Sequence, residues 1–155
     1  MPADVDNLFR TKEGISDAVK RDLLTPKVHL LVQLILQQRN AEEMCCIIFV
    51  ERVIVAAVIS SLMQQLDCLS FVISDYLSRA TSALCGKKQR KTLGCFSIGK
   101  VNVLVATDVV EEGIDVRSCS CVIRFDLPKT VRSFIQSRGR ARQNKSNFIL
   151  LRERQ

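Results

Sequence analysis

Residues 101–142 read VNVLVATDVVEEGIDVRSCSCVIRFDLPKTVRSFIQSRGRAR, and their patterns predict the fold. The segment 101–106 is a short apolar run rich in β-branched residues, and it stops at Thr107. A second buried-strand pattern, 121–125, stops at Asp126. Runs of this kind are typical of strands buried on both faces of a parallel sheet. Because ligand sites in such sheets lie where strands end, the polar residues at these two ends are candidates for function.

Carboxylates follow the first of these strands. Glu111, Glu112 and Asp115 surround Gly113. This segment is too polar for a core, and its carboxylates can accept hydrogen bonds from a ribose hydroxyl or from an arginine. Loop decoration is the alternative interpretation of the segment when it is taken alone.

Cations follow the second strand. Thr130 is the expected N-cap of a helix through Phe134 and Ile135. Residues 129–145 include six basic side chains and no acidic one. Arginine dominates the end of this segment, and the planar guanidinium group suits bidentate contact with phosphate. A solvated helix end that complements the helix dipole is the alternative for these arginines.

The rest of the chain alternates strands with helices. A leader or short helix is expected over 1–24, and one domain over 25–152. Thr25 and Pro26 begin the first helix of that domain. The strands are expected near 45–50, 69–73, 101–106, 121–125 and 147–151, and the helices near 27–38, 53–66 and 86–100 and after 130. This alternation predicts a three-layer α/β domain with a mainly parallel sheet of about five strands.

Three motifs in order resemble the second motor domain of a superfamily 2 helicase. They are residues 107–115, TDVVEEGID, residues 122–128, VIRFDLP, and residues 136–142, QSRGRAR. More narrowly, residues 122–142 resemble the Dicer branch of the duplex-RNA-activated helicases, and the plant Dicer-like ribonucleases in particular. The resemblance covers about residues 25–152 and implies a RecA-like domain. Residues 74–85 depart from it, because relatives usually carry a longer, glycine-containing loop there.

The resemblance implies roles for individual residues. Thr107 would contact the RNA backbone, together with Glu51 and Arg52 at the end of the strand near 45–50. Six residues would serve ATP: Gly113, Asp115 and Arg138 as cofactor contacts, and Gln136, Arg140 and Arg142 as catalytic residues. Gln136 would couple to a first motor domain, and the arginines would act as fingers on the γ-phosphate. The spacing leaves open which arginine is the finger, and Arg140 is favoured.

ATP turnover is not expected from this chain alone. Residues 94–100, GCFSIGK, match most of a phosphate-binding P-loop, but Val101 replaces the Ser or Thr that binds magnesium. The segment also precedes a strand instead of following one, so no helix N-terminus would face a phosphate. The sequence has neither a D-E-x-H motif nor a ribonuclease catalytic segment. ATP would therefore be shared with a separate first domain, and Mg²⁺ would bind only through that domain.

Composition narrows the partners and the compartment. The 155 residues are 47% hydrophobic and 25% charged, as in one ordinary globular domain. A net charge of +7 favours a polyanionic partner. Seven cysteines form no C-x-x-C pair and there is one histidine, so no metal site is expected. No apolar run is long enough to span a membrane, and no signal peptide is apparent. We therefore expect an intracellular protein, in the nucleus by family resemblance, with the cytoplasm as the alternative.

Two functions from different classes fit these features. The first is the second motor domain of a Dicer-like, duplex-RNA-processing helicase and endoribonuclease that makes small RNAs. Its partners would be double-stranded RNA and the N-terminal helicase and ribonuclease domains of the parent protein. The second is a non-catalytic module that binds duplex RNA or another protein. The carboxylates at 111–115 favour the first, because a simple RNA binder has little use for them on its binding side.

Overall fold

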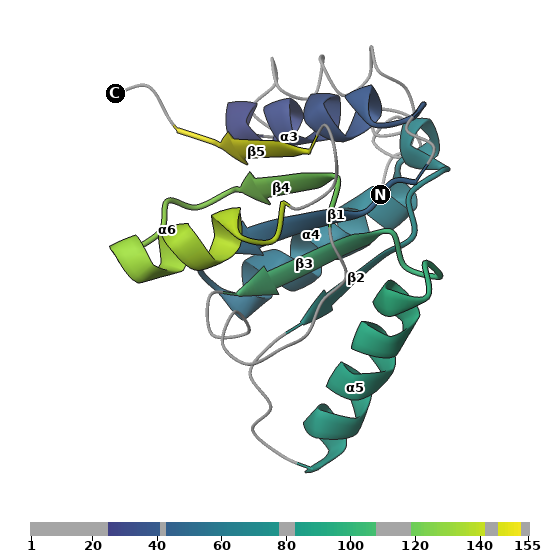
Figure 1. Cartoon of the computed structure of the whole chain (residues 1–155). Coiled ribbons are helices and arrows are strands. Elements are labelled where there is room, and N and C mark those ends of the chain that lie inside the picture. The colour runs from purple at the N-terminus through teal and green to yellow at the C-terminus, as the bar shows by residue number, and fades with distance from the viewer. Residues whose placement is uncertain (1–24, 41–42, 78–82, 108–118, 142–145, 153–155) are drawn as a thin grey trace.

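The computed structural model describes residues 25–40, 43–77, 83–107, 119–141 and 146–152 (Figure 1). Five strands form one sheet in the order β2-β3-β1-β4-β5, and every neighbouring pair is parallel. The strands are β1 (Cys46–Val50), β2 (Ser74–Leu77), β3 (Val103–Thr107), β4 (Cys121–Arg124) and β5 (Asn147–Leu150). The predicted α/β fold with a parallel five-stranded sheet is confirmed. The leader predicted over 1–24 lies outside the described residues.

Helices cover both faces of the sheet. They are α3 (Pro26–Gln37), α4 (Val53–Gln65), α5 (Ala83–Ser97) and α6 (Val131–Arg138), with a short 3-10 turn, η1 (Asp67–Leu69), after α4. The side chains of α3 and α4 join one buried cluster, whereas Phe96 of α5 joins the cluster on the other face. In Figure 1, α6 crosses that second face and α5 lies beside β2. The molecule therefore has the three layers that the alternating pattern predicts.

The middle strand, β1, shows why its sequence is apolar throughout. Ile48 and Val50 belong to the cluster beneath α3 and α4, whereas Ile47 and Phe49 belong to the cluster on the opposite face. All five residues of β1 are buried. A strand with helices on both faces cannot alternate apolar and polar residues, so it appears in the sequence as a continuous apolar run.

Helix α3 begins where its capping residues predict. The Val28 amide donates to Thr25 Oγ1 at 3.2 Å, and Pro26 occupies the first helical position. The cap satisfies one of the amides that a helix N-terminus leaves without an intrahelical partner. Leu31, Val32 and Ile35 then face the core.

The strand predicted over 69–73 is wrong. Leu69 and Val72 are buried, but in a 3-10 turn and the bend after it, and β2 is the polar segment that follows. Ser74 is buried in β2 because its hydroxyl donates to the Ser60 carbonyl at 2.8 Å, while Gln64 donates to the Ser74 carbonyl at 2.9 Å. These bonds satisfy the buried polar groups of Ser74. Hydropathy alone would assign this polar segment to a loop.

The P-loop-like segment is the end of a helix. Gly94 lies within α5, and Gly99 follows the helix with a φ of 81°, a left-handed conformation that glycine adopts without strain. The order is helix, turn and then β3, as the sequence predicted, and it is the reverse of a phosphate-binding loop.

Buried thiols behave as apolar side chains. Cys46 and Cys121 are paired in the register of β1 and β4, and both are fully buried. The hydrogen bond between the two thiols, followed by burial, raises the pKa of Cys46 well above its ordinary value. Within the described ranges, no three His, Cys, Asp or Glu side chains are grouped as metal ligands, and no helix has the length and apolarity needed to cross a membrane.

The replacement Gly94→Ala should stabilise the chain. A Cβ atom at Gly94 would meet nothing within 4 Å, and glycine inside a helix costs about 0.5–1 kcal/mol relative to alanine. We expect the free energy of unfolding, measured by urea denaturation with circular dichroism, to rise by about that amount. Gly99→Ala is the control, and it should lower stability because of its positive φ. A fall for Gly94→Ala would contradict the assignment of this position to an open helical face.

Candidate functional site

The three central strands end side by side at one edge of the sheet. The register pairs Val50 of β1 with Thr107 of β3, and Phe49 of β1 with Arg124 of β4. Because all the strands are parallel, the polar residues that follow them gather at this carboxyl edge. Glu51, Arg52, Thr107 and Asp126 all lie there, as the sequence predicted from the strand ends.

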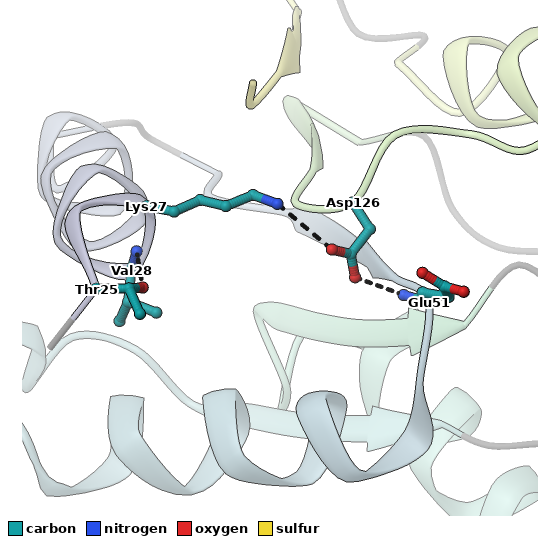
Figure 2. A network of polar contacts seen from close by, with 5 residues as sticks. All are labelled: Thr25, Lys27, Val28, Glu51 and Asp126. Carbon is teal, nitrogen blue, oxygen red and sulfur yellow. Dashed lines mark hydrogen bonds and ion pairs between the residues drawn. The ribbon is translucent and has the colours of Figure 1, made fainter. Parts of the chain in front are cut away.

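Asp126 ties three elements together at this edge. Its Oδ2 atom accepts a hydrogen bond of 2.7 Å from the Glu51 amide, and its Oδ1 atom lies 3.4 Å from Lys27 Nζ (Figure 2). The Lys27 ammonium also lies 4.5 Å from the centre of the Phe125 ring. Both carboxylate oxygens are therefore engaged within the chain, and Asp126 joins α3 to the ends of β1 and β4.

Glu51 forms a more exposed ion pair. Its Oε1 atom lies 2.8 Å from Lys129 Nζ, and the two side chains are 48% and 68% exposed. A pair this exposed contributes about 0–1 kcal/mol to stability. The predicted RNA contact of Glu51 is untested, but its carboxylate would repel a phosphate. Arg52, which is exposed beside it, is the residue of this pair whose charge suits an RNA backbone.

Thr107 has an unusual environment at the end of β3. The residue is 3% exposed, and its Oγ1 atom is buried without a hydrogen-bond partner among the residues that the structure describes. A buried hydroxyl without a partner costs about 1–3 kcal/mol. The hydroxyl therefore has unused hydrogen-bonding capacity, but it is not accessible from the surface in this conformation.

Arg124 is a candidate that the sequence reasoning passed over. It is fully buried in β4, and its guanidinium carbon lies 5.2 Å from the centre of the Phe49 ring. The signal was present, because an arginine interrupts the apolar run that precedes Asp126. The buried guanidinium group keeps its positive charge, since arginine does not lose its proton in proteins. It places a fixed positive charge on the face of the sheet that α6 crosses.

Arg140 lies at the opposite edge of the sheet from Thr107. Its carbonyl accepts a hydrogen bond of 3.0 Å from the Cys119 amide, two residues before β4 begins. The reason is geometric. Helix α6 has eight residues and is about 12 Å long, whereas β4 has four residues and is about 13 Å long. The helix therefore returns the chain to the amino edge, and the expectation that ligand sites lie at the strand ends does not extend to Arg140.

The remaining predicted residues divide into two groups. Arg138 is exposed in the last turn of α6, and Gln136 lies one turn or less before it on the same helix. Gly113, Asp115 and Arg142 fall outside the described residues. The structure thus brings Thr107, Glu51 and Arg52 together at one edge and separates them from Arg140 at the other.

Comparison with known proteins identifies relatives of this arrangement. The family described as "Helicase conserved C-terminal domain" matches residues 26–145. The endoribonuclease Dicer homolog 3b of Oryza sativa subsp. japonica is 43% identical over 157 residues, which cover 99% of this chain but 10% of that protein. The chain therefore spans about a tenth of the length of this relative.

Two solved structures share the fold. The Hef helicase domain of Pyrococcus furiosus matches with a TM-score of 0.65 and 26% identity, over 90% of this chain and 29% of that one. The E. coli DEAD-box protein SrmB matches with a TM-score of 0.64 and 27% identity, over 80% of this chain and 68% of that one. Both are helicase proteins, and the likeness supports the RecA-like architecture that the sequence predicts.

Removing the Asp126 carboxylate should destabilise the carboxyl edge. Asp126→Ala leaves the Glu51 amide and Lys27 without their acceptor, and hydrogen bonds to charged groups contribute about 1.5–3 kcal/mol each. Because Asp126 is partly exposed, we expect a loss of about 1–2 kcal/mol in urea denaturation. Lys129→Ala, which breaks only the exposed pair with Glu51, should change stability by less than about 1 kcal/mol. Equal losses for the two variants would refute the central role of Asp126.

Proposed function

We propose that this chain, which belongs to the helicase C-terminal domains of Dicer-like proteins, is the second motor domain of a duplex-RNA-processing helicase and endoribonuclease. In this role it supplies RNA-backbone and ATP contacts for small-RNA production and is incomplete alone. The observation that carries the proposal is the division of candidate residues between two edges of one sheet, linked by α6. One rigid domain can then engage RNA at one edge and nucleotide at the other.

At the amino edge, the residues fit a nucleotide phosphate. Arg140 is half-buried, and its carbonyl accepts a hydrogen bond from the Cys119 amide just before β4. Arg138, two residues earlier in the chain, is exposed. Phosphoryl transfer spreads negative charge over the equatorial phosphate oxygens, and a positioned arginine is worth about 10³ to 10⁵ in rate. Arg140 is the favoured finger, and Arg138 or Arg142 is the alternative. When bound, ATP would be shared with a first motor domain that supplies the P-loop and Mg²⁺.

Three further residues complete the proposed nucleotide side. Gly113 and Asp115 would approach the ribose, where a carboxylate can accept a hydroxyl hydrogen bond. Gln136 would contact the first domain from α6, so that closure of the two domains and positioning of the arginines occur together. The helix supports this coupling, because it is a continuous hydrogen-bonded rod between the two edges.

At the carboxyl edge, Thr107 and Arg52 are the proposed RNA contacts. The Thr107 hydroxyl is buried in the free chain, so in this proposal RNA binding exposes it and it then donates to one phosphate oxygen. Such a bond to a charged acceptor is stronger than one between neutral groups. Arg52 adds an exposed cation at the neighbouring strand end. Glu51 is placed better as the partner of Lys129 than as a phosphate contact.

Reconstitution tests the nucleotide side. Alone, the chain should show negligible ATPase activity, and adding a matching first motor domain with duplex RNA should restore it. Arg140→Ala should then lower kcat by about 10³ to 10⁵, because the γ-phosphate loses its cation. Arg39→Ala, which removes an exposed charge after α3, should not lower it. A chain that binds RNA but gives no ATPase with any first domain would be the non-catalytic module instead.

The replacement Thr107→Val tests the RNA side. It keeps the side-chain shape but removes the hydroxyl, so we expect duplex-RNA affinity to fall about 10-fold or more, since hydrogen bonds to charged groups are worth about 1.5–3 kcal/mol. Thermal stability should stay equal or rise, because the lost hydroxyl is buried without a described partner. Ser60→Ala is the control. It breaks the buried contact between the Ser60 and Ser74 hydroxyls and should lower stability without weakening RNA binding.

A further inference from the structure

One face of α5 carries a group of exposed cations. Lys87, Lys88, Arg90 and Lys91 are all exposed. With 3.6 residues per turn, these four positions share an arc of about 160° on the helix surface. Thr92 and Phe96 are buried on the opposite side of the same helix. The four side chains therefore form one continuous outward surface, which we call the α5 basic face.

We propose that the α5 basic face is a second RNA contact, which binds the phosphodiester backbone outside the strand-end group of Thr107 and Arg52. This inference rests on the proposed RNA-processing function and extends it to a surface outside the three motifs at 107–115, 122–128 and 136–142. The α5 basic face would add affinity without base specificity, because it presents charge to phosphates alone.

The described residues supply no acidic partner to this face. Across the described ranges, no carboxylate pairs with Lys87, Arg90 or Lys91. Asp75, a described acidic residue that contacts α5, accepts from Thr92 Oγ1 at 2.8 Å on the inner side of the helix. Lys88 lies 4.9 Å from the centre of the Tyr76 ring, a contact that leaves its charge in place. Four like charges within five residues repel one another, and a bound polyanion would relieve that repulsion.

Gly94 supports a close approach to this face. It lies one turn beyond Arg90 on the same arc, and a Cβ atom there would meet nothing within 4 Å. No internal packing among the described residues requires a glycine at this position. Glycine is suited to places where a ligand approaches the backbone closely, and a phosphate chain lying along the helix would do so.

The chemistry of the face favours RNA over an acidic protein. Protein interfaces depend on buried aromatic or aliphatic anchors, and none stands among the outward positions between Lys87 and Lys91. Three of the four cations are lysines, which contact phosphates as point charges.

The position of α5 also suits an RNA path across the carboxyl edge. Helix α5 follows β2, and β2 pairs with β3, whose last residue is Thr107. The α5 basic face therefore lies on the β2 side of the sheet, next to the strand that carries the proposed Thr107 contact.

Charge neutralisation on α5 tests the proposal. We compare the full chain with the double variant Lys87→Gln/Lys91→Gln, using a short blunt duplex RNA over a series of salt concentrations. Losing two phosphate contacts should weaken binding on the order of tenfold at about 0.1 M salt and lower the salt slope by about 2. The matched control Arg39→Gln/Lys100→Gln removes the same charge from residues at the amino edge. Its loss in log affinity should be less than a third of the loss for the α5 double variant.

A second variant removes any ambiguity about folding. Gly94→Glu adds a carboxylate to the centre of the face, where space is open, so circular dichroism should be unchanged while RNA affinity falls. Equal losses for the α5 and control doubles, or no loss for either, would overturn the proposal. It would also be overturned if the α5 variants lost binding to poly-glutamate but kept RNA binding. If the unaltered chain bound no RNA, the proposed function itself would fail. If the reconstituted protein showed RNA-stimulated ATPase activity and the α5 variants bound RNA as tightly as the unaltered chain, only the α5 contact would be refuted.

Discussion

The parallel register of β1 between β3 and β4 is the constraint on which the rest of the structure depends. It pairs Val50 with Thr107 and Phe49 with Arg124, so the three strands stop at one level. The polar residues at the ends of these strands, Glu51, Arg52, Thr107 and Asp126, are therefore at the same edge. Asp126 secures this edge by accepting from the Glu51 amide and facing Lys27. A shift of one residue in any of these strands would move its side chains to the other face.

The match between the lengths of α6 and β4 places Arg140 at the amino edge of the sheet. A helix rises about 1.5 Å per residue and a strand about 3.3 Å per residue. The eight residues of α6 are therefore about as long as the four residues of β4, and they bring the chain back from the carboxyl edge to the amino edge. Arg140 consequently lies beside Cys119, far along the sheet from Thr107. This arrangement is the basis of the proposed function, in which nucleotide is contacted at one edge and RNA at the other.

Charge is distributed unevenly over this frame. Glu51 and Asp126 keep their carboxylates occupied by lysines, whereas the cations of α5 face outward without such partners among the described residues. The exposed cations of α5 and of the end of α6 are two local groups that contribute to the net charge of +7. Polyanions are attracted to such local concentrations more than to the average charge of a protein.

The sequence by itself determined the apolar strands β1, β3, β4 and β5, the capped helix α3 and the family, because continuous apolar runs and motif order depend on local chemistry. It failed at β2, where Ser74 is buried through hydrogen bonds to distant residues of α4. It also could not place Arg140 or reveal the buried cation of Arg124, since both depend on how elements far apart in the chain pack. Tertiary structure alone decided which candidate residues share an edge, because that is set by strand register and helix length together.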